Sequence, residues 1–590
     1  MRPSRAMYAC LVGAMLAGGA LGAQPADPRI DPETGCSNAR WPTPRRFDHL
    51  HMRLELRFPD MARAELEGVQ HLRVTPIGSP RDVLELDCRG PRVSSVLVDG
   101  APAPFEMLDG KLRITFPAPV PPGHEVACTI AYTLDFSANR GEGLTWARPR
   151  SNASSPSRAA PMVHAQGQAQ LNSMWFPCHD FPNERLTTEI IADVEDGFDV
   201  VSNGRLVSRE PAGEGRTRWH WSQDTPHVNY LVTIAIGKWH VEDVGGEGSA
   251  RPGLAMPVYV DHADAANITP IFGGTAPMMA FFEELFSEPY PWHQYAQVCV
   301  RGFAAGGMEN TGCTLLIDST SRSSRPGSQD DLIAHELAHQ WTGDLLTCNS
   351  WEHLWLNEGW ASYAECLWQE HKAGPDADAA KRAYLRAVVG YVRAQRARNR
   401  ARAPEYPAMA SNLYANPDDV FGKADDVYAK GALVLHMLRM KLGDGPFFDG
   451  TRAYIRAHRF GTVETSDFRR ALERASGRNL EQFFDQWVYR PGLPSLAADY
   501  AWDDASSTLR VAIEQTQAID EYNPPYRLDL PLRVTYPDGT LEWHTIPVRS
   551  QTASTSFALR ARPTQVSIDP EITQASRLEI RTPLEPVGGG

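Results

Sequence analysis

Residues 335–339 read His335-Glu336-Leu337-Ala338-His339 and lie in a stretch whose apolar residues recur at helical spacing. Four residues of an α-helix turn through about 400°, so the two histidines point in nearly the same direction, one turn apart. Two imidazoles placed in this way suit one Zn²⁺ ion, which binds histidine nitrogen at about 2.1 Å. Glu336 lies about 100° further round the helix, where its carboxylate can take a proton from the attacking water.

A catalytic zinc ion needs a third protein ligand and one open position. Glu358 is the candidate, because it follows His339 by 19 positions and a turn over residues 343–351 would return a second helix beside the first. The short His-Glu-x-x-His motif also arises by chance, and a single glutamate on a helix is commonly solvated. The joint pattern of both histidines and both glutamates therefore predicts one zinc ion per chain.

Strand patterns dominate both ends of the chain. Its 590 residues are too many for one hydrophobic core, so three domains are expected. Between residues 45 and 245, short apolar–polar alternations separated by Gly and Pro, such as residues 51–56, predict an N-terminal β domain. From residue 496 to 590 the alternation returns, most regularly over 528–536, and predicts a small C-terminal β-sandwich.

Helix-length stretches fill residues 246–495, the part of the chain that contains the zinc motif. The clearest of them are 330–343, 354–371, 378–400 and 427–441. The expected fold class is therefore α+β and multidomain, with the zinc motif in a mainly helical catalytic domain.

The first 44 residues predict targeting and connection rather than a packed domain. Two arginines precede a short apolar run, residues 6–21, and small residues follow it. This order is typical of a secretory signal peptide over residues 1–23, and the run is too short and too rich in Gly and Ala to favour a transmembrane helix. Residues 24–44 are polar and proline-rich and predict a linker. We therefore expect a secreted or periplasmic protein with no stable membrane span after signal removal.

Charge and cysteine content narrow the possible partners. The formal net charge of −14 argues against nucleic acid, because binding to phosphates usually needs a basic face. Of the nine cysteines, Cys10 lies in the signal segment and eight remain, an even number in an oxidising compartment. Cys88 and Cys128 lie in strand-like stretches and could pair, and unpaired buried thiols are an equally open alternative.

The residues around the zinc motif carry a resemblance to a known family. The His-Glu-x-x-His motif, eighteen residues and then a glutamate reproduce the pattern of the M1 family of metallopeptidases. The flanking segments 341–344 and 354–359, Trp-Thr-Gly-Asp and Leu-Trp-Leu-Asn-Glu-Gly, are similar to those of the family. The resemblance covers about residues 45 to 590 and implies a thermolysin-like catalytic domain at 246–495.

Gly306-Gly307-Met308-Glu309-Asn310, upstream of the zinc motif, resembles the exopeptidase signature of that family. An aminopeptidase must bind a free α-ammonium and reject an internal peptide, and a fixed carboxylate in a closed pocket does both. Glu309 suits this role. The glycines let the backbone approach a substrate that lies against it like an added strand. We therefore place all five residues in the substrate site.

Three further site residues follow from the resemblance alone. Tyr428 is similar to the catalytic tyrosine of the family, and a phenol can donate a hydrogen bond to the oxyanion that zinc also stabilises. Gln168 precedes a segment, 175–182, that is similar to a family motif, and stands where the family has a Gln or Glu that contacts the substrate amine. Gln166 is placed in the same part of the amine pocket.

Together these features predict a zinc metallo-aminopeptidase that removes the N-terminal residue from peptides with a free N-terminus. Two alternatives remain open. A zinc endopeptidase of the thermolysin type would cut N-terminally blocked peptides. A non-catalytic peptide-binding protein on the same scaffold would bind zinc without turnover.

Overall fold

The computed structural model describes residues 30–584, apart from 32, 35, 140, 151–154, 247–251, 402–407, 423–424 and 521–522. The expected signal peptide and the first residues of the expected linker lie outside the described residues. The chain forms two compact units, which divide after Ala39. In the first unit, Ile30 and Ser37 form an isolated antiparallel bridge. The second unit contains all the elements considered below, and no helix in the described part of the chain is long and apolar enough to cross a membrane.

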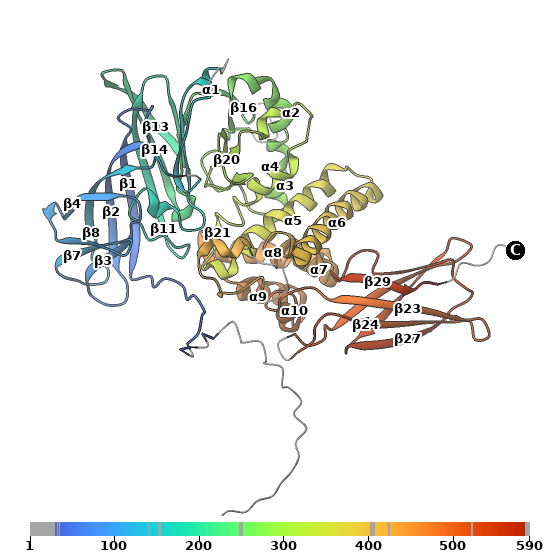
Figure 1. The fold of residues 1–590 in the computed structure, drawn as a ribbon. Coiled ribbons are helices and arrows are strands. Elements are labelled where there is room, and N and C mark those ends of the chain that lie inside the picture. Colours follow the sequence, from blue (N-terminus) through green and yellow to red (C-terminus); the bar gives the residue numbers. More distant parts are fainter. Residues whose placement is uncertain are drawn as a thin grey trace, which may run out of the picture. The chain divides into compact units, whose positions relative to one another are not determined.

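An eight-stranded sheet forms the largest part of the N-terminal β region (Figure 1). Met52, Leu54 and Leu56 of its strand β1 are buried and alternate with more exposed residues, as the sequence predicts. Strand β1 runs parallel to β11 and antiparallel to β2. In sheet order the strands are β13 (Arg205–Gly213), β14 (Arg216–Val228), β11 (Arg185–Glu195), β1 (Phe47–Arg57), β2 (Glu65–Pro76), β8 (Val126–Asp135), β4 (Arg92–Val98) and β5 (Ala101–Pro102).

Two smaller sheets complete the N-terminal β region. One has the order β3 (Arg81–Asp87), β7 (Lys111–Val120), β6 (Phe105–Leu108). The other has the order β12 (Asp199–Ser202), β15 (Ile234–Gly237), β10 (Met162–Gln166), β9 (Gly143–Ala147). Strand β10 ends at Gln166, so this second sheet leads directly into the segment that carries Gln168.

A five-stranded sheet opens the helical region. Its order is β16 (His240–Asp243), β17 (Pro257–Val260), β18 (Ala296–Val300), β20 (Cys313–Ile317), β19 (Gly307–Met308). The pairing of β16 with β17 spans residue 245, where we expected a domain boundary. Strand β19, which contains part of the Gly-Gly-Met-Glu-Asn stretch, lies at the end of the sheet order and pairs only with β20 among the described strands.

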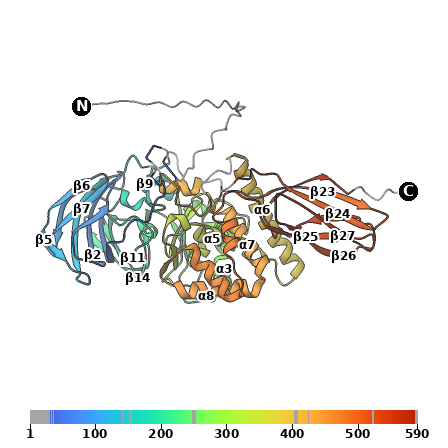
Figure 2. The same ribbon diagram turned by 90° about the horizontal axis from the view of Figure 1, so that it is seen from below.

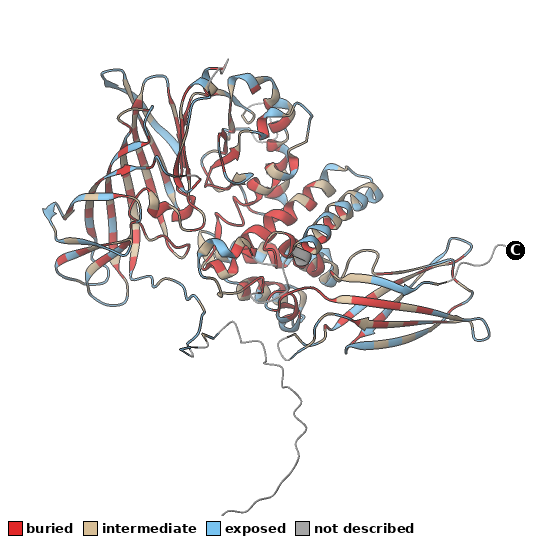
Figure 3. Cartoon of the chain, viewed as in Figure 1, coloured by how far each residue is buried: buried red, intermediate tan, exposed pale blue. Residues whose placement is uncertain are grey.

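The four helices expected from the sequence are present: α4 (Asp330–Ala338), α5 (Trp355–Lys372), α6 (Ala377–Ala401) and α7 (Ala429–Leu442). Helix α4 ends at Ala338, five residues earlier than expected, and Gly343 follows with a φ of 145°, a conformation that favours glycine. Helix α5 packs between α4, α6 and α7, and Figures 1 and 2 show α5 and α7 side by side. Figure 3 shows that α5 is buried along most of its length, whereas α6 keeps an exposed face.

The other helices of this region complete its packing: α2 (Ile268–Phe272), α3 (Thr275–Phe286), α8 (Asp444–His458), α9 (Thr465–Ser476) and α10 (Glu481–Trp487).

Two sheets form the C-terminal β region. Leu528, Leu530, Leu532 and Val534 are buried on alternate positions of β25, as the sequence predicts. The four-stranded sheet has the order β27 (Thr552–Ala558), β24 (Thr508–Gln515), β23 (Ser495–Asp503), β29 (Arg577–Thr582). The three-stranded sheet has the order β26 (Leu541–Val548), β25 (Leu528–Thr535), β28 (Gln565–Ile568).

The cysteines decide between the two alternatives that the sequence left open. All eight that lie among the described residues are unpaired, and all except Cys36 are buried. Cys88 follows β3 of the sheet β3-β7-β6, whereas Cys128 lies on β8 of the eight-stranded sheet. The structure therefore has buried thiols at these positions and no bridge between them.

Candidate metal centre and active site

Three side chains converge at the point where α4 meets α5. The Nε2 atoms of His335 and His339 lie 3.3 Å apart. Oε2 of Glu358 lies 3.4 Å from the first of these nitrogens and 3.2 Å from the second. A tetrahedral zinc ion with bonds of about 2.1 Å separates its ligands by about 3.4 Å. These three atoms therefore fit one zinc ion, and they form the one such group found among the described residues.

The outer nitrogens of both imidazoles have acceptors. Nδ1 of His335 donates to Oε1 of Glu365 at 2.9 Å, and Nδ1 of His339 donates to the backbone oxygen of Thr342 at 3.0 Å. Because a carboxylate and a carbonyl only accept, these bonds leave the lone pairs of both Nε2 atoms for the metal. The early end of α4 supplies the second acceptor. Glu365 was not predicted from the sequence. The signal that could have found it is its spacing: it follows Glu358 by seven residues on α5, so both lie on one helix face.

The charges of this cluster are strongly coupled. Burial by itself would lower the pKa of His339, but Glu309 and Glu358 outweigh burial and raise this pKa to about 9. Burial would raise the pKa of Glu358, yet the two histidines lower it to about 2. The Glu358 carboxylate therefore stays ionised between the two histidine rings, where it favours a positive charge, either a proton on an imidazole or a metal ion.

Glu336 lies against strand β19. A Cβ atom added at Gly307 would lie 2.2 Å from Oε1 of Glu336, so glycine is required for this close approach. At Gly306 an added Cβ would meet only Leu332, at an ordinary 3.4 Å. Burial raises the pKa of Glu336 to about 8. A carboxyl group with a pKa close to neutral can both accept and return a proton.

A second buried carboxylate, Glu309, lies beside the metal cluster. Its Oε1 accepts hydrogen bonds from the hydroxyl of Tyr230 at 3.2 Å and from Nε2 of Gln168 at 3.3 Å. The same Gln168 nitrogen lies 3.4 Å from Oε1 of Glu358. Glu309 is only 2% exposed. Gln168 therefore links the metal cluster to Glu309, and the sequence placed both residues in the site.

Tyr230 belongs to the N-terminal β region and was not found by sequence analysis. It lies in a short 3₁₀ turn, η2 (Asn229–Leu231), and is fully buried. No local motif marks it, because its contact with Glu309 joins residues 79 positions apart. Its position shows that the N-terminal β region supplies a wall of the site.

Tyr428 lies beside the first histidine of the metal cluster. Its ring stacks on the ring of His335, with centroids 5.9 Å apart and an interplanar angle of 24°. Burial, followed by the charges of Glu358 and Glu309, raises the pKa of Tyr428 well above its usual value. The phenol therefore stays protonated and keeps a hydrogen to donate.

A cavity of about 440 Å³ joins these side chains. Ten of the twelve residues predicted for the site line it. Met308 and Asn310 do not, and both are buried beside it. The lining residues are Gln166, Gln168, Ala305, Gly306, Gly307, Glu309, Leu332, His335, Glu336, His339, Glu358, Glu365 and Tyr428. The side-chain oxygen of Gln166 is buried with no hydrogen-bond partner among the described residues, so it is available to a donor in this cavity.

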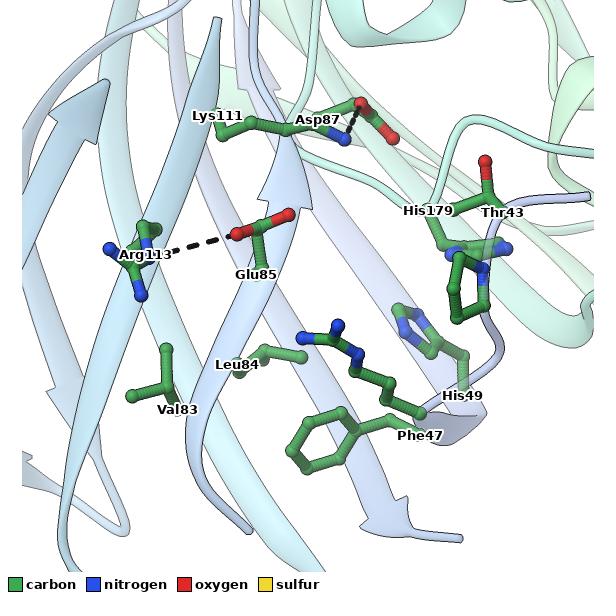
Figure 4. A pocket seen from close by; sticks show the side chains of 12 residues that line it. Thr43, Phe47, His49, Val83, Leu84, Glu85, Asp87, Lys111, Arg113 and His179 are labelled. Carbon is green, nitrogen blue, oxygen red and sulfur yellow. Dashed lines mark hydrogen bonds and ion pairs between the residues drawn. The ribbon is translucent and has the colours of Figure 1, made fainter. Parts of the chain in front are cut away.

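Another cavity, of about 130 Å³, lies in the N-terminal β region and shares no lining residue with the first (Figure 4). It also contains two histidines, His49 and His179, whose ring centroids are 5.9 Å apart. Two of its cationic side chains have anionic partners on the cavity wall. Lys111 pairs with Asp87 at 2.6 Å and Arg113 with Glu85 at 3.6 Å. Among the described residues no carboxylate forms a ligand group with these two histidines, as Glu358 does with His335 and His339.

Comparison with known proteins agrees with this geometry. The family model described as the peptidase family M1 domain matches residues 272–487, and that of the peptidase M1 N-terminal domain matches residues 48–231. Together they cover about two thirds of the chain.

Three relatives illustrate the similarity. Aminopeptidase N of Streptomyces lividans is 28% identical over 442 residues, which cover 73% of this chain and 49% of that protein. Human aminopeptidase B is 26% identical over 433 residues, covering 71% of this chain and 62% of that protein. Human glutamyl aminopeptidase is 30% identical over 330 residues, covering 54% of this chain and 33% of that protein. The chain thus spans about half the length of the first relative and about a third of the last.

Proposed function

Because the chain belongs to peptidase family M1, we propose that it is a zinc aminopeptidase. Its substrates are peptides with a free N-terminus, and its product is the released N-terminal residue. The single observation that carries this proposal is Glu309, a carboxylate buried at the wall of the same cavity as the histidine cluster. A buried carboxylate in a closed site favours a substrate ammonium and disfavours an uncharged internal peptide.

His335, His339 and Glu358 would hold one Zn²⁺ ion, since their ligand atoms have the separations that a tetrahedral ion needs. Zinc in such a site polarises a carbonyl group and makes water more acidic. Glu365 and the Thr342 carbonyl orient the two imidazoles through their outer nitrogens.

Glu336 acts as the general base and then as the general acid. Its carboxylate takes a proton from the attacking water and later gives it to the leaving amine. Burial raises the pKa of this carboxyl group, which makes its ionised form a stronger proton acceptor. Because Gly307 has no Cβ, it leaves room for this carboxylate against β19. The substrate backbone would run along β19 as an added strand.

Glu309 and Gln168 receive the substrate ammonium, and Gln166 offers a further acceptor in the same cavity. Tyr428 donates a hydrogen bond to the oxyanion that forms on the scissile carbonyl. The uncharged phenol is suited to this task because its raised pKa prevents ionisation.

The proposal also includes the domain bounds of the chain and the location of the enzyme. We assign residues 45–245 to the N-terminal β domain, 246–495 to a thermolysin-like catalytic domain and 496–590 to a C-terminal β-sandwich. We also propose that residues 1–23 are a cleaved signal peptide, that 24–44 form a linker and that the enzyme acts in the periplasm or outside the cell.

The substitution Glu309→Gln tests the proposal. It keeps the shape of the side chain and removes the charge that binds the ammonium. We expect kcat/KM for aminoacyl arylamides with a free amine to fall by about 10²-fold, the size of effect that a buried charged partner has. Glu284→Gln, an exposed glutamate on α3, is the matched control and should leave kcat/KM unchanged.

The result to compare is the preference for free-amine over N-acetylated substrates. If Glu309 binds the ammonium, this preference collapses in Glu309→Gln and persists in Glu284→Gln. An unchanged preference would remove Glu309 from the amine site and favour the endopeptidase alternative.

A further inference from the structure

Helices α5 and α7 touch through glycine on both sides. A Cβ atom added at Gly359 of α5 would lie 2.9 Å from the Cα of Gly431 and 3.1 Å from its carbonyl carbon. A Cβ atom added at Gly431 of α7 would lie 2.7 Å from the Cα of Gly359. The obstructing atoms are backbone atoms, which cannot rotate away as a flexible side chain would. Any larger residue at either position must therefore push the two helices apart.

The contact between the two glycines lies close in sequence to two groups of the site, the Glu358 carboxylate and the Tyr428 phenol. Gly359 directly follows Glu358, the carboxylate of the metal cluster. Gly431 lies three residues after Tyr428, in the first turn of α7, where the Tyr428 carbonyl accepts the amide hydrogen of Ala432 at 2.9 Å. A change in the separation of the two helices is therefore transmitted within one helical turn to the position of the phenol relative to the cluster.

Other contacts fix the start of α7 from different directions. Arg398 of α6 lies 2.8 Å from Asp426, which accepts the amide hydrogen of Tyr428 at 3.0 Å. The fully buried Lys430 pairs with Asp425 at 2.7 Å and donates to the backbone oxygen of Arg490 at 3.0 Å. These contacts hold the turn before α7, whereas the glycine contact limits how close α7 comes to α5.

We propose that the contact between Gly359 and Gly431 sets the distance from Tyr428 to the metal cluster, and that the two glycines are positioning residues for the tyrosine. The inference rests on the proposed role of Tyr428 in the hydrolysis. A displacement of a transition-state donor by about 1 Å can reduce the rate by about 10²-fold. Metal binding depends on α4 and α5, so it should persist when α7 moves.

Gly431→Ala is the test, and Gly390→Ala is its matched control. Gly390 also lies in a helix, α6, but a Cβ atom added there meets nothing within 4 Å. Alanine is the better helix former, so the control should keep its activity and its thermal stability. In Gly431→Ala we expect kcat to fall by about 30-fold to 100-fold, with KM and bound zinc changing by less than about threefold.

A double-mutant cycle separates positioning from general damage. Combining Gly431→Ala with Tyr428→Phe removes the group whose position is at stake. If the contact acts through Tyr428, Gly431→Ala should change kcat by less than about threefold in the Tyr428→Phe background. An equal loss of kcat in both backgrounds would overturn the proposal. So would full activity of Tyr428→Phe, which would still leave the aminopeptidase function standing.

A crystallographic measurement does not depend on activity. The distance between the ring centroids of His335 and Tyr428, 5.9 Å in the wild type, should increase in Gly431→Ala and stay constant in Gly390→Ala. An unchanged distance in Gly431→Ala would overturn the proposal even if the wild type proved inactive. Gly359→Ala approaches the same contact from α5 and replaces Gly431→Ala if that variant does not fold.

Discussion

His335 and His339 line one cavity of this protein and His49 and His179 line another, and the two pairs differ in one respect. The pair on α4, His335 and His339, shares the carboxylate of Glu358, and its Nε2 atoms are 3.3 Å apart. The pair in the N-terminal β region, His49 and His179, has ring centroids 5.9 Å apart and forms no ligand group with a carboxylate of the described residues. The second cavity also contains carboxylates, but they form ion pairs with cationic side chains: Asp87 with Lys111 and Glu85 with Arg113 (Figure 4).

The same difference appears in the protonation of the rings. Burial, and to a smaller extent the neighbouring His179 and Arg45, lower the pKa of His49 to about 3. Burial acts on His339 in the same direction, yet Glu309 and Glu358 reverse the result and raise its pKa to about 9. The carboxylates of Glu309 and Glu358 therefore favour a positive charge at the pair on α4, whereas burial disfavours a charge on His49.

The largest expected effect distinguishes the two pairs by metal content. His339→Gln removes a ligand, so zinc per chain should fall from one to near zero, and hydrolysis of aminoacyl arylamides should fall by about 10⁴-fold or more. His179→Gln is the matched change in the other cavity and should keep one zinc ion and its activity. Atomic absorption on both proteins checks this, and zinc loss in His179→Gln would show that the pairs are not distinct.

Glu336→Gln should give the next largest effect. It removes the base without removing a ligand, so kcat should fall by about 10³-fold while zinc stays at one per chain. Glu184, a glutamate beside the N-terminal histidines, is 2% exposed and pairs with Arg45. Glu184→Gln is therefore the buried control, with kcat expected to stay within about twofold. Steady-state kinetics on both variants measures kcat. If Glu336→Gln retains one tenth of the wild-type kcat, Glu336 is not the base.

Glu365→Gln should have a smaller effect, on metal affinity. An amide at this position can still accept from Nδ1 of His335, but it lacks the charge that makes the imidazole a better ligand. We expect the zinc dissociation constant to rise by about 10-fold to 100-fold, measured by competition with a chelator. Gln369→Ala, one turn further along α5, contacts Asp331 rather than a ligand and serves as the control. Equal zinc affinities of wild type and Glu365→Gln would show that Glu365 does not tune the site.

The smallest expected effect is on the stability of the fold at acid pH, and it comes from His49 in the N-terminal β region. The pKa of His49 is lower in the folded chain than in the unfolded chain, so below about pH 6.5 the unfolded chain binds the proton first. Stability is therefore lost as the pH falls toward 3. Between pH 7 and 5.5 the wild type should lose about 1 kcal/mol from this residue alone, and His49→Gln should lack this loss. Calorimetry at both pH values measures it, and His124→Gln, an exposed histidine, should keep the wild-type loss.

The sequence predicted those parts of the site that local spacing determines. The histidines one turn apart and the buried alternation of β1 and β25 require only the periods of a helix and a strand. Helix α4 ends at Ala338 although the helical pattern of the sequence continues to Trp341, and Gly343 then adopts a φ that favours glycine. That early end exposes the Thr342 carbonyl to His339.

Residues brought together only by folding were not predictable. Tyr230 reaches Glu309 from another region of the chain, and nothing in its own neighbourhood marks it. The contact of Gly359 with Gly431 depends on how two helices cross, which neither helix sequence shows by itself. The open question of Cys88 and Cys128 also required the structure, which shows both as unpaired buried thiols, Cys88 just after β3 and Cys128 on β8.

The most direct test of the proposed aminopeptidase function uses the zinc-loaded wild-type protein and two substrates. One is a peptide with a free N-terminus, and the other is the same peptide N-acetylated. For an aminopeptidase we expect stepwise release of N-terminal residues from the first peptide, no cleavage of the second, and loss of the release in Glu336→Gln. Cleavage of the acetylated peptide would contradict it and identify an endopeptidase. Turnover of neither peptide, with one zinc ion bound, would contradict it in favour of a peptide-binding protein.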